Sequence, residues 1–163
     1  MNPKNYILRT FKGSAAKFHF AIVVSNFNSS ITNKLLEGAK RCLNRHNIPD
    51  KNITIVYCPG AFELPQVANI LAAKKKYDAI ICLGAVVRGE TPHFEYISSE
   101  TARGIQDVAL HHSIPTIFGV LTTDNERQAL ERVGGKHGHK GWDAALTAIE
   151  MASLFQKLKK NKR

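Results

Sequence analysis

The run AIICLGAVV at residues 79–87, followed directly by RGETPHF at residues 88–94, decides the fold of this chain. The first part holds no charged residue and is rich in apolar side chains, which is typical of a strand buried on both faces of a parallel sheet. Gly89 and Pro92 then mark a turn and the start of a helix. The sequence therefore predicts a strand, a turn and a helix, the basic unit of an α/β protein.

The turn after this strand carries reactive polar side chains. In open α/β sheets, ligands bind outside the carboxyl ends of the strands, where backbone N–H groups and helix N-termini converge. Arg88, Thr91 and His93 place a cation, a hydroxyl and an imidazole at that position. The pattern predicts phosphate binding beside proton-transfer chemistry.

Residues 84–91 also nearly match the phosphate-binding pattern G-x-x-x-x-G-K-[ST], but Glu90 stands where the lysine should be. That lysine supplies positive charge to the β- and γ-phosphates of a nucleotide. A carboxylate there would repel a nucleoside triphosphate, so the sequence argues against an NTPase.

Strands and helices alternate along the rest of the chain. Short apolar runs precede segments with apolar residues at helical spacing. This order predicts right-handed βαβ crossovers and one parallel, doubly wound sheet. We expect strands at 18–25, 53–58, 79–87 and 115–122, and helices at 30–47, 62–75, 92–112, 125–133 and 142–160.

Two helix starts have candidate N-cap residues, whose side chains would bond free backbone N–H groups. Ser29 or Ser30 is expected to cap the first helix, and Asp124 the fourth. Pro65 is expected in the first turn of the second helix, where its missing N–H is tolerated.

Length and composition indicate one cytoplasmic globular domain. The chain has 163 residues, 44% hydrophobic and 22% charged, and a chain of this size buries roughly 70% of its unfolded surface. No apolar run approaches the roughly 20 residues that cross a bilayer, and residues 1–5 lack the apolar core of a signal peptide. We expect a single domain over 1–163, with an N-terminal arm at 1–17, a basic tail at 156–163 and no membrane partner.

The net charge of +10 raises the alternative of nucleic-acid binding. Residues 157–163 supply half of it, and residues 74–76 add a second lysine run at a helix end, where cations complement the macrodipole. The sequence has no zinc-finger spacing, RNP-like aromatic strand or basic recognition helix. We therefore expect no nucleic-acid partner.

The cysteines and histidines suggest neither a disulfide framework nor a metal site. Cys42, Cys58 and Cys82 are odd in number and form no C-x-x-C pair, which predicts three buried free thiols. His137 and His139 are two imidazoles with no cysteine or carboxylate beside them, which falls short of a metal site. We expect no metal.

The segments after the four predicted strands should line one rim of the sheet. They are residues 26–28, 60–63, 88–93 and 123–125. An aromatic ring (Phe27), a carboxylate at a helix start (Glu63) and the phosphate-like turn would together form a small-molecule pocket.

Five motifs in order carry a family resemblance: FNSSIT at 27–32, PGAFELP at 59–65, GAVVRGETPHF at 84–94, FGVLTT at 118–123 and KGWDAA at 140–145. Together they resemble the lumazine synthase family over residues 18–158, with far more specificity than any one motif alone. The resemblance implies a single-domain, flavodoxin-like three-layer sandwich, with a four-stranded parallel sheet and helices on both faces.

The resemblance also implies a transferase of riboflavin biosynthesis. Members of the family condense 5-amino-6-(D-ribitylamino)uracil with 3,4-dihydroxy-2-butanone 4-phosphate, giving 6,7-dimethyl-8-ribityllumazine, phosphate and water, without a metal or an organic cofactor. Two alternatives share the fold: an archaeal-type riboflavin synthase and a non-catalytic flavin-binding or shell-forming protein. The intact motif set disfavours both.

For the pyrimidine substrate, the resemblance implies stacking on Phe27, hydrogen bonds from the ribityl chain to Glu63, and main-chain recognition by residues 85–87. The alternatives are a core phenylalanine at a strand end and a carboxylate that only complements a helix N-terminus. The full set implied for ribitylaminouracil is Phe27, Ala61, Phe62, Glu63, Ala85, Val86, Val87, Phe118 and Lys140.

For the butanone phosphate, the resemblance implies backbone binding at Glu90 and Thr91, with the Glu90 side chain turned away, and a bidentate contact from Arg132. Arg132 could instead be a solvated helix-end arginine, and Arg88 is expected to be structural. His93 is implied as the catalytic proton-transfer residue. The alternative for His93 is a helix N-terminal histidine that bonds only backbone.

Finally, the resemblance implies a homopentamer, with twelve pentamers forming an icosahedral shell in some members, and riboflavin synthase as a further partner. Each active site would lie between two subunits, with Phe27, Glu63 and His93 from one and Phe118, Arg132 and Lys140 from its neighbour.

Overall fold

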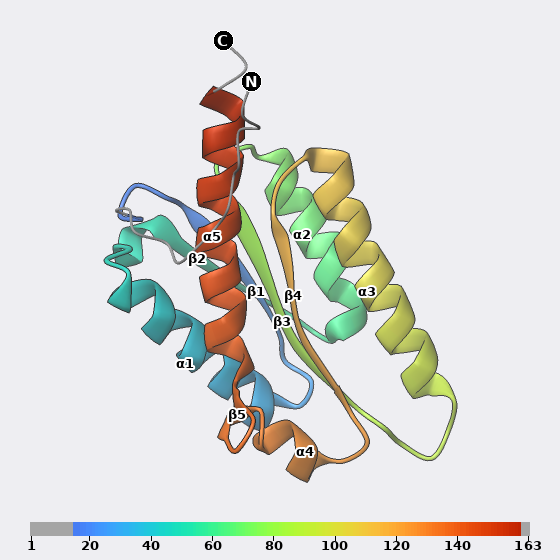
Figure 1. Cartoon of the computed structure of the whole chain (residues 1–163). Coiled ribbons are helices and arrows are strands. Elements are labelled where there is room, and N and C mark those ends of the chain that lie inside the picture. The colour runs from blue at the N-terminus through green and yellow to red at the C-terminus, as the bar shows by residue number, and fades with distance from the viewer. Residues whose placement is uncertain (1–14, 161–163) are drawn as a thin grey trace, which may run out of the picture.

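The computed structural model describes residues 15–160 as a three-layer α/β sandwich (Figure 1). Its central sheet has four parallel strands in the order β2-β1-β3-β4. Helices α1 and α5 cover one face, and α2 and α3 cover the other. The predicted doubly wound parallel sheet is confirmed. Most of the expected N-terminal arm and the end of the basic tail lie outside the described residues.

The four strands are β1 (Phe20–Ser25), β2 (Ile53–Cys58), β3 (Ala79–Val87) and β4 (Thr116–Thr123). The helices are α1 (Ser29–Arg45), α2 (Leu64–Ala73), α3 (His93–His112), α4 (Glu126–Leu130) and α5 (Lys140–Lys160). Two 3-10 turns, Asp50–Asn52 and Ala61–Glu63, precede β2 and α2. A small hairpin of β5 (Val133–Gly135) and β6 (Gly138–His139) precedes α5.

The two middle strands form the centre of the core. Every residue of β1 is buried, as is β3 from Ala79 to Ala85, because helices cover both of their faces. The outer strands β2 and β4 are partly exposed. All four strands run in one direction, so their carboxyl ends meet at one rim, as the alternating pattern predicts.

Both predicted helix caps are wrong. Asn28, in the left-handed region at φ 58°, precedes α1, and its side-chain amide donates to the Ala85 carbonyl over 2.8 Å. Asn125 precedes α4 and accepts a hydrogen bond from the Gln128 N–H at 3.0 Å. The Asp124 carboxylate instead accepts from Arg88. Tertiary contacts therefore decide the roles of the Asn28 and Asp124 side chains, whereas Asn125 makes a local cap.

The segment between α4 and α5 also differs from the prediction. The helix expected at 125–133 ends at Leu130, and the helix expected from Trp142 begins at Lys140. Between them Val133 pairs with His139 in the β5–β6 hairpin. Strands of two and three residues are too short to leave an alternating pattern in the sequence.

The prediction of three buried free thiols is confirmed. Cys42 lies in α1, Cys58 ends β2 and Cys82 is central in β3. Burial raises the pKa of Cys42 to about 12 and that of Cys58 to about 11, and it raises the pKa of Cys82 further. These thiols are therefore small core side chains with little thiolate character.

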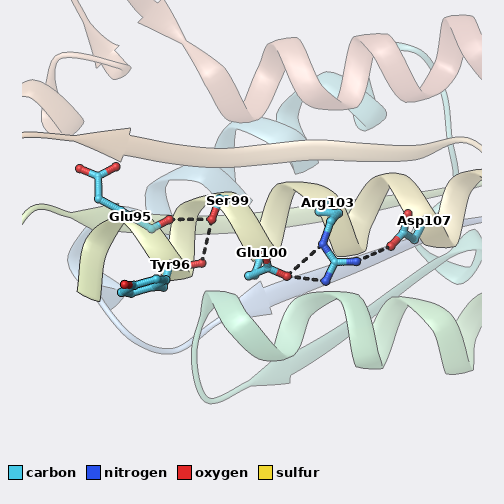
Figure 2. A network of polar contacts seen from close by, with 6 residues as sticks. All are labelled: Glu95, Tyr96, Ser99, Glu100, Arg103 and Asp107. Carbon is cyan, nitrogen blue, oxygen red and sulfur yellow. Dashed lines mark hydrogen bonds and ion pairs between the residues drawn. The ribbon is translucent and has the colours of Figure 1, made fainter. Parts of the chain in front are cut away.

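The outer face of α3 combines ion pairs with exposed apolar side chains. Arg103 pairs with Glu100 and with Asp107, one turn to either side (Figure 2). Tyr96 and Leu110 on the same helix are 68% and 69% exposed. Among residues 15–160, α3 included, no helix is long and apolar enough to cross a membrane.

Candidate active site

The carboxyl ends of β1, β2 and β3 open into one pocket of about 750 Å³. Its lining is mostly apolar, with a few convergent polar groups, as is usual for small-molecule sites. Nine of the residues expected to form the site line it together: Phe27, Ala61, Phe62, Glu63, Ala85, Val86, Val87, Thr91 and His93.

Phe27 is held at the pocket by backbone bonds that extend the β1–β2 ladder. The N–H groups of Asn26 and Phe27 donate to the carbonyls of Cys58 and Pro59 over 2.8 and 2.9 Å. Asn28 then ties the same turn to Ala85 of β3. The Phe27 ring itself is 71% exposed, so the backbone is fixed while the aromatic face stays open to a planar ligand. This exposure contradicts a strand-end core phenylalanine.

Glu63 stands at the junction of the 3-10 turn and α2. Its Oε2 atom accepts a hydrogen bond from the Gly60 N–H at 2.9 Å, which closes the turn that carries Ala61 and Phe62. The carboxylate also lines the pocket. One carboxylate oxygen, Oε2, therefore holds the turn. The carboxylate can also accept hydrogen bonds from hydroxyl groups of a ligand.

The loop between β3 and α3 is braced by Arg88. Its Nη1 atom donates to Glu95 at 2.6 Å and its Nε atom to Asp124 at 3.0 Å, and its guanidinium lies 4.3 Å from the centroid of the Phe94 ring. The Arg88 N–H also donates to the Thr123 carbonyl. The hydrogen bond from Arg88, followed by that from Gln128, lowers the pKa of Asp124. Arg88 is thus committed to protein groups, as the sequence predicts.

The tip of this loop faces the pocket. Gly89, Thr91 and His93 line it, while Glu90 is exposed and outside the lining. His93 is the first residue of α3, so the positive end of the helix dipole lies beside its imidazole. The arrangement offers backbone N–H groups, a hydroxyl and an imidazole to an anionic ligand.

Three expected site residues lie away from this pocket. Phe118 and Lys140 line a second hollow of about 500 Å³ along β4, between α3 and α5. Phe118 of β4 pairs in register with Cys82 of β3. Cys82 precedes the pocket-lining residues 85–87 by three to five positions, which is about 10–17 Å along a strand. Arg132 follows α4 and donates from Nη1 to the Gln128 carbonyl at 2.8 Å. One subunit therefore does not assemble the whole expected set.

Four lining residues are outside the expected set of site residues: Gly60, Gly89, Phe94 and Ile97. The two glycines lie in the segments 60–63 and 88–93 that the sequence places at the rim, whereas Phe94 and Ile97 were given no role in the site. The signal for Ile97 was present, because it follows His93 by four residues and so lies on the same face of α3. Phe94 is placed by its contact with Arg88, which no pattern in the sequence indicates. Within residues 15–160, no three histidine, cysteine or acidic side chains cluster as metal ligands.

Comparisons with known proteins agree with the motifs. Residues 17–156 match the family described as 6,7-dimethyl-8-ribityllumazine synthase. The chain is 52% identical over 153 residues to proteins of that name from two Clostridium kluyveri strains, ATCC 8527 and NBRC 12016; the match covers 93% of this chain and 99% of each relative. The family match begins before β1 and extends into α5. The chain belongs to the 6,7-dimethyl-8-ribityllumazine synthase family.

Proposed function

We propose that the pocket at the carboxyl ends of β1, β2 and β3 is where this chain makes 6,7-dimethyl-8-ribityllumazine. The substrates are 5-amino-6-(D-ribitylamino)uracil and 3,4-dihydroxy-2-butanone 4-phosphate, and phosphate and water are released. This is the condensation step of riboflavin biosynthesis, to which family membership assigns the enzyme.

The pyrimidine occupies the apolar floor of the pocket. Its ring stacks on the exposed face of Phe27, a contact worth about 0.5–1.5 kcal/mol beyond the burial of area. Main-chain groups at the end of β3 read the uracil edge, although the Ala85 carbonyl already accepts from Asn28 and has one lone pair to spare. The ribityl hydroxyls donate to Glu63 beside Ala61 and Phe62.

His93 transfers protons during the condensation. An amine of the pyrimidine attacks the ketone and water leaves to give an imine. Phosphate is then eliminated, and tautomerisation of the resulting enol leaves a carbonyl. The ribityl-bearing nitrogen attacks this carbonyl, and loss of a second water closes the ring. Each step needs a proton removed or delivered near neutral pH, where imidazoles exchange protons. Phosphate is a good leaving group, so holding the two substrates together supplies a large share of the acceleration.

The butanone phosphate binds at the loop that begins α3. Backbone groups at Glu90 and Thr91 and the α3 dipole attract the anion, and the Glu90 side chain, which does not line the pocket, keeps its charge away from it. Arg132 completes the phosphate site in bidentate fashion, but it comes from a neighbouring copy, together with Phe118 and Lys140.

A ring of identical subunits supplies that neighbour. The hollow along β4, the edge strand of the sheet, is lined by Phe118 and Lys140, while the pocket with the first half of the residue set opens at the rim. In such an assembly, the β4 edge of each subunit contacts the pocket rim of the next subunit. This heterologous contact repeats from subunit to subunit until the ring closes. We propose a homopentamer, and the exposed Tyr96 and Leu110 on α3 are apolar surface that such a ring would cover.

The observation that carries the proposal is the convergence of Phe27, Glu63, Thr91 and His93 on one pocket in a chain of this family. The test is turnover with both substrates, followed by the absorbance of the lumazine. Lumazine formation with release of one phosphate per product is expected. Formation of riboflavin from lumazine alone would indicate a riboflavin synthase instead, and no turnover of either kind would indicate a non-catalytic relative.

A further inference from the structure

The ring of His139 occupies a position on α1 that only a glycine can offer. A Cβ atom built at Gly38 would lie 2.0 Å from Cε1, 2.3 Å from Nδ1 and 2.6 Å from Nε2 of His139. Carbon atoms of separate residues do not approach so closely, so any side chain at position 38 would displace the ring. The imidazole is therefore seated directly on the backbone of α1.

A second glycine extends this close approach into α5. A Cβ atom at Gly141 would lie 2.0 Å from the Leu35 carbonyl oxygen of α1. Leu35 and Gly38 are one turn apart, and so face the same side of α1. The segment 139–141 is thus pressed against α1 at two successive points.

The segment 139–141 contains Lys140, one of the two cations assigned to substrate and phosphate binding, and backbone hydrogen bonds join it to the other, Arg132. His139 pairs with Val133 in the hairpin, and the Lys140 N–H donates to the Arg132 carbonyl over 2.8 Å. On the other side, the His137 N–H donates to the Glu131 carbonyl at 3.0 Å. The backbones of Arg132 and Lys140 therefore move with the hairpin, and the hairpin is located on the core by His139.

We propose that His139, through its fit against Gly38, is a positioning residue that sets where Arg132 and Lys140 present their charges to the neighbouring subunit's substrate. The inference rests on the proposed function, in which Arg132 binds the butanone phosphate. His139 itself touches no substrate, and acts through the two residues that flank the hairpin.

Close packing against the backbone of α1 locates the ring. Its Nδ1 atom is buried without a hydrogen-bond partner in the described part of the chain. Charged side chains of both signs surround it, on α1 and at the start of α5: Lys34, Glu37, Lys40, Arg41 and Asp143. Desolvation, then Arg41, lowers the pKa of His139, against smaller opposing effects of a backbone hydrogen bond, Asp143 and Glu37. A neutral ring fits this site, and replacement by a smaller side chain would leave a space that the hairpin could move into.

The test compares steady-state kinetics of His139→Ala, Gly38→Ala and the double variant with those of Arg132→Ala. We expect His139→Ala and Gly38→Ala each to raise the KM for the butanone phosphate about 10-fold, since small displacements of binding groups are costly, with kcat within about 2-fold. The KM for the ribitylaminouracil should stay unchanged. The double variant should recover part of the loss, because the methyl group introduced at position 38 would fill the space left by the ring.

His137→Ala is the matched control. It removes an imidazole from the same hairpin that lies 3.8 Å from the Glu131 carboxylate, and it should leave both KM values as in the wild type. If His139→Ala raised the KM values for both substrates, His139 would have only a general structural role. The same would follow if the effects of His139→Ala and Gly38→Ala on the KM for the butanone phosphate simply added in the double variant. Arg132→Ala separates the two levels of the argument: if it fails to raise the phosphate KM, the proposed function is wrong, whereas if it does and His139→Ala does not, only this inference is wrong.

Discussion

The Nη1 atom of Arg88 donates a hydrogen bond to Oε1 of Glu95 over 2.6 Å, which joins the end of β3 to the first turn of α3. Residues 89–92 form the loop between these anchors. The same guanidinium reaches Asp124 after β4 and covers the Phe94 ring. The position of His93 in the pocket is therefore set by a side chain that does not line it.

Arg88→Ala should lower turnover while changing stability little. Exposed ion pairs of this kind add little to folding free energy, but the loop that presents Thr91 and His93 would lose its brace, and we expect kcat to fall about 10-fold. Arg88→Lys should rescue poorly, because an ammonium cannot pair with two carboxylates and stack on a ring in one geometry. Thermal unfolding and steady-state kinetics measure both effects. Wild-type kcat in the alanine variant would contradict the bracing role.

His93→Ala should slow turnover about 10- to 100-fold without abolishing it, because proximity of the two substrates remains after the proton-transfer group is lost. Single-turnover formation of lumazine with both substrates bound isolates this step. His111→Ala, at the far end of the same helix, serves as the control. A His93→Ala enzyme as fast as the wild type would remove His93 from the chemistry.

Arg132→Ala and Phe27→Ala should each weaken the binding of a different substrate. Loss of a hydrogen bond to a charged group costs about 1.5–3 kcal/mol, so Arg132→Ala should raise the KM for the butanone phosphate roughly 10- to 100-fold. Phe27→Ala should instead weaken binding of the ribitylaminouracil. Equilibrium titration with each substrate distinguishes the effects, and an Arg132→Ala variant impaired only toward the pyrimidine would reverse our assignment.

Mixed assemblies should restore activity if each site is shared. A variant with Phe27 and His93 replaced and a variant with Arg132 and Lys140 replaced should each be nearly inactive. After unfolding and refolding in equal amounts, random mixing in a ring gives intact sites at roughly a quarter of the interfaces. Activity near that fraction of the wild type is expected. A mixture as inactive as its parents would place the whole site in one chain.

The stability contributed by His139 should depend on pH. Because burial lowers its pKa from the ordinary value near 6.5, the unfolded chain binds more protons than the folded one between the lowered pKa and about pH 6.5. The contribution is therefore complete above this window and is lost as the pH falls through it. Urea midpoints of the wild type and His139→Ala should differ most above pH 7 and converge toward pH 5. A constant difference would contradict a partly buried neutral imidazole.

The sequence was most informative where burial is strongest. The strand at 79–87 has the predicted bounds, because a fully covered strand needs an uninterrupted apolar run. The helix at 92–112 was predicted within one residue of α3. The pocket followed from the topology alone, since parallel strands bring their carboxyl ends together. Nine of the expected site residues meet there for that reason.

The errors fall where polar side chains have several possible partners. Ser29, Ser30 and Asp124 have good capping chemistry, but the chain places Asn28 and Asn125 at those positions. Nothing local shows that Asn28 will reach Ala85 of another strand. The hairpin that seats His139 was missed for a related reason, since its glycines predict a loop equally well. Family resemblance supplied the roles of Phe118, Arg132 and Lys140, which the geometry of one chain does not bring to the pocket.

The three buried thiols have a practical consequence. With their pKa values raised by burial, Cys42, Cys58 and Cys82 should react slowly with maleimides at neutral pH, because the thiolate is the nucleophile. A cysteine introduced at the exposed Lys157, near the C-terminal end of α5, would be modified first. A fluorophore or a cargo molecule could then be attached at one chosen position per subunit without removing any native cysteine.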